Sequence, residues 1–290
     1  MENIVNFDTL LALIDDHDDE VYFAVRDRII AAGPDILPVL EYTLSSPASL
    51  LQHERLEQII RQLKIRKLID KTAQWANSED KSLLDGWILV SSIHYPTILP
   101  EKIEQLIQRI YLDIWIELND SLTIIEKVAI INHIFYNFYH FELNLADLNA
   151  PENYLLNNLL VSRKGNQLSL ATLYCILAKK LNLPIHPLSL GQFVILGYYE
   201  PEISKEVYGD NTHPYLFYIN MEHKGAILGA KELEFVVHDI KEGTSENIVP
   251  LNEGKHIKKL LTLLKDSYLL KGLADKAAIA MQLIEKLQKF

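Results

Sequence analysis

The residues best suited to covalent chemistry lie in one segment, residues 163–196, with the sequence RKGNQLSLATLYCILAKKLNLPIHPLSLGQFVIL. It reads as a loop, a helix and a strand, an order that can hold a nucleophile at a helix start beside a base on a strand. The candidate nucleophiles are Cys175, the only cysteine, and Ser169; the candidate bases are His186 in the same segment and His213 beyond it. No cysteine or lysine opens the helix and no histidine lies on the strand that follows, so the pattern alone does not establish an active site.

Cys175 has the surroundings of a structural cysteine. Its neighbours one and two helical turns away are Leu168, Ala171 and Ala178, which are small or apolar. We therefore expect it to face the core, where burial raises the pKa of a thiol and makes it inert. Ser169 could act as a nucleophile only with a base beside it.

Metal and cofactor sites are not predicted. The acidic run DDHDDE at residues 15–20 contains hard ligands, but adjacent residues of a tight turn point in different directions and no glycine stands where a calcium loop needs one. We interpret the run as a solvated turn between helices. Glycine-rich phosphate loops and the GxSxG, HExxH and CxxC motifs are absent from the sequence. We expect no cofactor and no metal.

Composition and charge narrow the class of protein. The chain has 290 residues, 49% hydrophobic and 23% charged, with a net charge of −11, which disfavours binding to nucleic acid or anionic membranes. A single cysteine fits a reducing compartment. No basic leader or long apolar run is present, so we expect a cytoplasmic protein without membrane association.

The hydrophobic periodicity predicts an α+β fold with three regions. Residues 1–78 read as two helix pairs, of which the first resembles a HEAT-type repeat. Residues 79–250 hold further helices, then the strands QFVILGYY and YLFYIN and a hairpin, which predict a small antiparallel sheet. Residues 251–290 read as a helical hairpin broken at KGLAD, similar to a single TPR unit.

The stretch from residue 153 to 196 resembles the bacterial transglutaminase-like core family to which the invasion regulator SirB was assigned. The resemblance rests on NYL at 153–155, RKG at 163–165, LSLATLY at 168–174 and AKKLNLP at 178–184. GQF at 191–193 stands where that family carries GHF, and FYINMEHKGAIL matches the family's next strand. The resemblance implies a papain-type core.

In active members of that family a cysteine at the helix start attacks, a histidine on the next strand activates it, and an aspartate or asparagine orients the histidine. The resemblance places these positions at Gln167, Gln192 and Asn220. Neither glutamine can perform the covalent or proton-transfer role. The resemblance therefore implies a degenerate site and an absence of catalytic residues.

We accordingly expect a non-catalytic binding or scaffolding module with a protein or peptide as its partner and a regulatory role. The alternative is an amide hydrolase or acyltransferase that uses Ser169 or Cys175 with His186 or His213. The sequence specifies neither the partner nor the oligomeric state.

Overall fold

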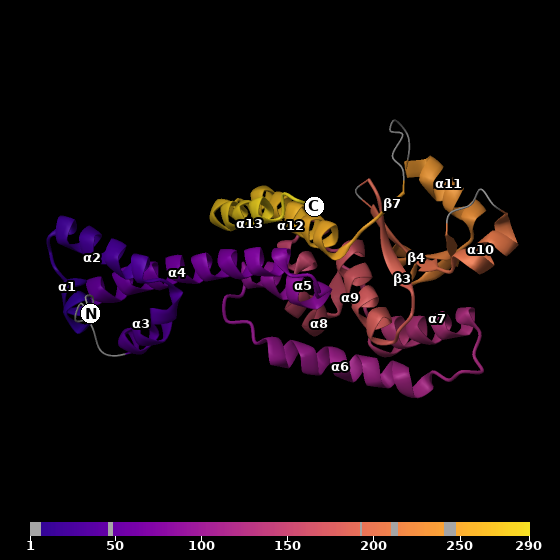
Figure 1. Ribbon diagram of the computed structural model, residues 1–290, viewed down its shortest axis with the longest axis horizontal. Helices are drawn as coiled ribbons and strands as arrows, with labels where there is room; N and C mark the ends of the chain where they lie inside the picture. The colour runs from indigo at the N-terminus through magenta and orange to yellow at the C-terminus, as the bar shows by residue number, and fades with distance from the viewer. Residues whose placement is uncertain (1–6, 46–48, 192, 210–213, 241–247) are drawn as a thin grey trace. The chain divides into compact units, whose positions relative to one another are not determined.

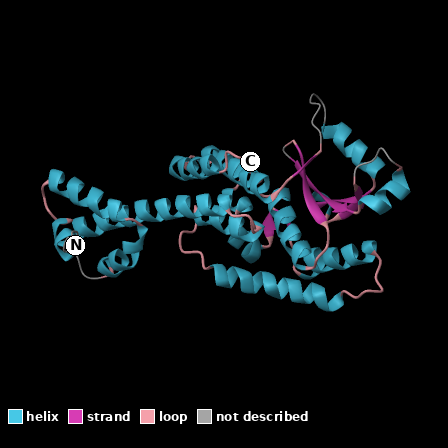
Figure 2. Cartoon of the chain, in the orientation of Figure 1, coloured by secondary structure: helices cyan, strands magenta, loops and turns pink. Residues whose placement is uncertain are grey.

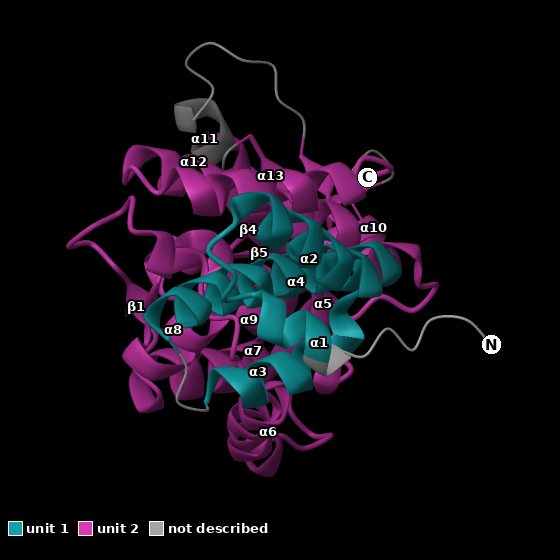
Figure 3. Cartoon of the chain, turned by 90° about the vertical axis from the view of Figure 1, so that its left-hand side faces the viewer, with its two compact units in different colours: residues 1–74 teal, residues 75–290 magenta. Residues whose placement is uncertain are grey.

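A computed structural model describes residues 7–45, 49–191, 193–209, 214–240 and 248–290. The chain divides into two compact units, residues 1–74 and 75–290, which are coloured separately in Figure 3. The division falls near the end of a long helix. Each unit has its own cluster of buried apolar side chains.

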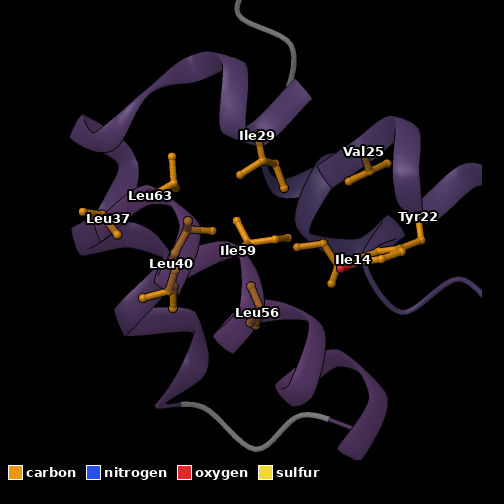
Figure 4. Close-up of a cluster of buried hydrophobic side chains, with 10 residues drawn as sticks. Ile14, Tyr22, Val25, Ile29, Leu37, Leu40, Leu56, Ile59 and Leu63 are labelled. Carbon is orange, nitrogen blue, oxygen red and sulfur yellow. The ribbon is translucent and has the colours of Figure 1, made fainter. Parts of the chain in front are cut away.

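The first unit is built from helices, as its periodicity predicts. Its elements are α1 (Phe7–Leu13), α2 (Asp19–Ala32), the 3₁₀ turn η1 (Pro34–Ile36), α3 (Leu37–Leu44) and α4 (Leu50–Asn77), of which the last three residues belong to the second unit. Buried side chains from α2, α3 and α4 and from Ile14, just after α1, meet in one cluster, drawn in Figure 4, and the partly buried Leu10 and Leu11 of α1 pack against it. Burial of this apolar surface is the main stabilising contribution in the unit.

Hydrogen bonds and an ion pair within the protein hold the acidic turn at residues 15–20 in place. Asp18 begins α2, and its carboxylate accepts a hydrogen bond from the Glu20 N–H at 2.9 Å. The buried guanidinium of Arg55 donates to the carbonyl oxygens of Ile14 and Asp16 at 2.9 and 2.6 Å and pairs with Asp19 at 3.0 Å. These contacts give the turn a structural role.

The second unit contains most of the helices and the main sheet. Its helices are α5 (Leu83–Ser92), α6 (Pro100–Glu117), α7 (Ile124–Asn132), the π-helix η2 (His133–Phe138), η3 (Pro151–Tyr154), α8 (Leu156–Ser162), α9 (Gln167–Lys180), α10 (Pro201–Tyr208), η4 (Met221–His223), α11 (Ala230–Ile240), α12 (Glu253–Leu270) and α13 (Ala274–Lys286). A capping box starts α7, because Thr123 and Glu126 exchange hydrogen bonds at 2.8 and 3.3 Å.

The main sheet is antiparallel, with the strand order β6-β5-β4-β3-β7, and lies among the helices of this unit (Figure 2). Its strands are β3 (Ile185–Leu190), β4 (Phe193–Tyr199), β5 (Tyr215–Asn220), β6 (Ala226–Leu228) and β7 (Val249–Pro250). A separate two-stranded parallel ladder joins β1 (Glu142–Leu143) to β2 (Lys164–Gly165). Both predicted strands are present as β4 and β5 and pair antiparallel, and the predicted hairpin is confirmed as β5 and β6. Strand β3 is not among the strands that the sequence predicts.

Helix α9 is the central helix of the second unit. Every residue from Leu168 to Ala178 is buried, because α9 packs against β3 and β4 and also against α5, α6 and α8. A helix that is apolar nearly all round is expected to be enclosed in this way. The C-terminal hairpin is also confirmed: α12 and α13 run side by side in Figure 1. The fold is α+β, as predicted. Among the described residues, no helix combines the length and apolarity needed to cross a bilayer.

Candidate functional site

The start of α9 is held by a second capping box. Asn166 caps the helix, with its side-chain oxygen accepting from the Ser169 N–H at 2.8 Å. In return, the Ser169 hydroxyl accepts from the Asn166 N–H at 3.0 Å and donates to the Asn166 carbonyl at 3.0 Å. Ser169 is fully buried. Its hydroxyl is therefore committed to closing the first turn of the helix.

Gln167 connects the first turn of α9 to the sheet. Its side-chain oxygen accepts a hydrogen bond from the backbone N–H of Val194 on β4 at 3.2 Å. The helix start and the beginning of β4 are thus neighbours. Gln192, the second predicted position, lies outside the described residues.

Asn220 ends β5 with its side chain turned onto its own strand end. It is 8% exposed, and its side-chain oxygen accepts from the Glu222 N–H at 2.9 Å, which caps η4. Within the described part of the chain, no hydrogen bond joins the Asn220 side chain to Gln167. The structure therefore positions two of the three predicted amides, each bonded to backbone.

Cys175 lies two turns into α9 and is 6% exposed. Burial raises the pKa of its thiol well above the usual range. The expectation of a core-facing cysteine with a raised pKa is confirmed. Such a thiol is largely protonated at neutral pH and a poor nucleophile.

Among the described residues, no hydrogen bond joins the candidate base His186 to Ser169 or Cys175. His186 lies on β3, where its ring packs near Tyr199 and Tyr215, with centroid distances of 5.3 and 6.3 Å. Partial burial lowers the pKa of His186. His213 lies outside the described residues. Among the described residues, the close imidazole–hydroxyl pair on α9 is instead His256 with Thr172, at 2.7 Å.

Close packing, and not an unusual backbone conformation, explains the glycine at position 165. The sequence predicts a backbone conformation that disfavours side chains, but the left-handed residue of this turn is Arg163, with φ of 65°. Gly165 lies on β2 and is packed tightly: a Cβ there would clash with the Ser169 hydroxyl and come within 2.9 Å of Leu159. The strained-glycine prediction is wrong, and close approach to the start of α9 is the physical reason for the glycine.

A cavity of about 1490 Å³ opens further along α9. Its lining comes from α5, α6, the middle and end of α9, β3, β7 and the start of α12. Cys175, His186 and His256 belong to the wall, whereas Gln167 and Asn220 do not. The cavity is thus separate from the two described amide positions, but it brings together Cys175 and His186, a nucleophile and a base of the enzyme alternative, in one wall.

The residues that build α9, the sheet and this cavity fall largely within one region of sequence similarity. The sequence model of the transglutaminase-like superfamily matches residues 101–262, just over half of the chain. The chain belongs to the transglutaminase-like superfamily. In this transglutaminase-like protein the match runs from α6 into α12, so it includes both the amide positions and most of the cavity. No curated protein and no solved structure matches the chain.

His256 is the site residue that sequence reasoning missed. The segment GKHIKKLLTLL carries it at helical spacing with Leu260 and Leu264, both fully buried. That periodicity could have indicated a histidine on the buried face of the helix. Its partner Thr172 lies 84 positions away in the sequence, so no local signal could have found the pair.

Proposed function

We propose that this transglutaminase-like protein is a non-catalytic, SirB-like binding or scaffolding module that acts in the cytoplasm on a protein or peptide partner. The observation that carries the proposal is the first turn of α9. An amide, Gln167, occupies the place that the family resemblance assigns to a nucleophile, and it is bonded to the backbone of β4.

The burial of the other two candidate nucleophiles, Ser169 and Cys175, supports the same conclusion. The Ser169 hydroxyl is buried inside a capping box, and Cys175 is a buried thiol whose pKa is raised. An acyl-transfer enzyme needs a nucleophile within hydrogen-bond reach of a base. The enzyme alternative would therefore require a rearrangement of α9 or a contribution from outside the described residues.

The helical hairpin α12–α13 offers a surface suited to a protein partner. Leu270 and Met281 are 70% and 56% exposed on it. Exposed apolar side chains on a helix pair are a common feature of protein interaction surfaces. We propose that this hairpin works as a TPR-like unit, and that the N-terminal helices work as a HEAT-like surface.

Treatment with electrophilic probes tests the non-catalytic assignment. The folded protein is incubated with an iodoacetamide probe for cysteine and a fluorophosphonate probe for serine, and labelling is measured by intact mass. We expect little labelling of the folded chain and alkylation of Cys175 after denaturation. Stoichiometric labelling of the folded chain that is abolished by Ser169→Ala or Cys175→Ala would establish the enzyme alternative.

The binding assignment is tested with a purified partner. Partners are captured by cross-linking in the source cells, identified, and then reconstituted with the purified chain in a binding titration. We expect Leu270→Asp to weaken binding at least about tenfold, since a charge would replace buried apolar contact. Lys286→Ala on the same hairpin is the control. Equal binding by Leu270→Asp would remove the hairpin as the docking surface.

A further inference from the structure

One edge of the main sheet borders a hollow. Strand β6 is the last strand in the sheet order, so its inner side pairs with β5 and no described strand pairs with its outer side. A hollow of about 410 Å³ touches both Ala226 and Ile227 of β6. Successive strand residues point to opposite faces of a sheet, so a hollow that touches both residues lies along the edge of the strand. Such an edge presents backbone donors and acceptors to another chain.

The opposite wall of the hollow is one face of α7 and of the π-helix η2 that continues it. The wall is formed by residues spaced three or four positions apart or adjacent to one another: Ala129, Asn132, His133, Tyr136 and Asn137. Asn132 donates a hydrogen bond from Nδ2 to the carbonyl oxygen of Gly225 at 2.8 Å, which ties the helix to the turn before β6. A π-helix is a rare element that occurs frequently at functional sites. The hollow is thus a groove between a helix and an edge strand, and an extended peptide can add to such an edge as a further strand.

The charges around the hollow fit an acidic peptide. Lys224, His133 and His223 line it with exposed side chains, and no carboxylate is among the lining residues. This lining contrasts with the whole chain, whose net charge is −11. Asn137 adds a carboxamide that lies 3.2 Å from Nδ1 of His133, whereas Glu222, next to His223 in the sequence, does not line the hollow. Ammonium, imidazole and carboxamide groups all donate hydrogen bonds to a carboxylate.

We propose that the outer side of β6 binds an extended peptide segment that carries a carboxylate side chain. The peptide backbone pairs with β6, and the carboxylate contacts Lys224. The proposal specifies the chemistry of a partner in the proposed function, and it rests on that function being the binding of a protein or peptide. The groove between β6 and η2 is distinct from the hairpin α12–α13 and from the start of α9.

A library of short, random, linear peptides displayed on phage tests for such a ligand. Peptides selected on the purified full chain are synthesised and titrated into isotope-labelled protein, and the backbone amide signals are followed by NMR. We expect saturable shifts at Ala226, Ile227 and Leu228, and an aspartate or glutamate at a fixed position of the selected peptides. Selection of no peptide, or shifts confined to other parts of the chain such as α12–α13, would overturn the proposal.

Methylated peptides separate strand pairing from binding through side chains alone. Along a strand, the residues that hydrogen-bond to one neighbour alternate with those that face the other way. Methylation of the backbone nitrogens of one alternate set therefore removes the donors to β6, whereas methylation of the other set leaves them. We expect the first set to weaken binding at least about tenfold relative to the second. Equal affinity of the two methylated peptides would rule out strand addition.

Matched lysine variants test the carboxylate contact. Lys224→Gln removes the ammonium, so it should bind the acidic peptide and the analogue with an amide in place of the acid equally well. Lys231→Gln, at an exposed position of α11 outside the hollow, should retain a preference of about tenfold for the acidic peptide. Should Lys224→Gln fail to fold, the two peptides are compared on the wild-type chain, and equal affinity for both would overturn the proposal. Labelling by electrophilic probes is measured separately, so a failed peptide titration and a failed non-catalytic assignment are distinguishable.

Discussion

Helix α9 has different surroundings at its first turn and at its middle. At the first turn, the Asn166, Gln167 and Ser169 side chains each bond to backbone, and the described cavity does not reach them. At the middle, Cys175 and His256 line a cavity, and the imidazole has a nitrogen without a protein partner. The unsatisfied polar group thus lies away from Gln167, the position that the family resemblance assigns to a nucleophile. One helix is thus closed by hydrogen bonds to backbone at its first turn and borders a cavity two turns later.

Overpacking at Gly165 should give the largest loss of stability at the first turn. Gly165→Val places atoms against the Ser169 hydroxyl and Leu159, and we expect it to lower the free energy of unfolding by about 3 kcal/mol. Urea denaturation followed by circular dichroism measures the change. Lys164→Val, at the exposed neighbouring position, should cost much less. A loss of equal size in both variants would mean that close packing at Gly165 is unimportant.

Moving the thiol from position 175 to position 167 of α9 should strongly increase its rate of reaction with an electrophile. In a Cys175→Ala background, Gln167→Cys places the thiol in the first helical turn, where the helix dipole and partial exposure favour the thiolate. Cys175 is buried and its pKa is raised. We expect the introduced thiol to react with iodoacetamide about a hundredfold faster than the wild-type thiol at neutral pH.

The control for this reactivity is the denatured state. Both thiols should react at similar rates in denaturant, since their surroundings are then alike. If the introduced thiol reacted as slowly as Cys175 in the folded protein, the first turn would be as closed as the middle of the helix. The proposed difference between the surroundings of the first turn and of the middle of α9 would then be wrong.

The buried imidazole should make stability depend on pH. Burial, with a smaller effect of Lys259, lowers the pKa of His256 from 6.5 to about 3. Between these values the unfolded chain binds the proton and the folded chain does not, so stability falls as pH falls. From about pH 6.5 to about pH 4.5 this group should remove roughly 2–3 kcal/mol.

Comparison with His256→Phe isolates this contribution from other titrating groups. Urea denaturation is carried out across the pH range for both proteins, and the difference between the two curves is plotted. The wild-type chain should lose more stability than the variant as the pH falls. Parallel curves would show that His256 is exposed to solvent or protonated in the folded state.

Removal of the α9 cap should have the smallest effect. Asn166→Ala deletes the acceptor for the Ser169 N–H and should cost about 1 kcal/mol. Asn166→Asp keeps an acceptor and adds a negative charge favourable at a helix start, so it should fold with near wild-type stability. Thermal denaturation measures both. An Asn166→Asp variant as unstable as Asn166→Ala would show that the cap geometry, and not the acceptor, is what matters.

The burial of Cys175 and the helical hairpin at the C-terminus were predictable, because both depend on periodicity within a short stretch. Strand β3 was not, because Pro187 interrupts its pattern and removes one backbone donor. The role of Gly165 was misread for a related reason. The sequence shows a glycine in a turn, but it does not show that the side chain of Ser169 packs against that position.

By itself the sequence determined the α+β class, the helices at both ends, the succession of strands β4, β5 and β6, and the absence of a nucleophile at Gln167. These properties follow from hydrophobic period, turn residues and side-chain chemistry, which are local. Only the tertiary structure decided that Gln167 bonds to β4, that the Asn220 side chain caps its own strand end, and that His256 meets Thr172 beside a cavity. Those contacts join residues on different elements or depend on the path of the backbone, so packing of the whole unit determines them.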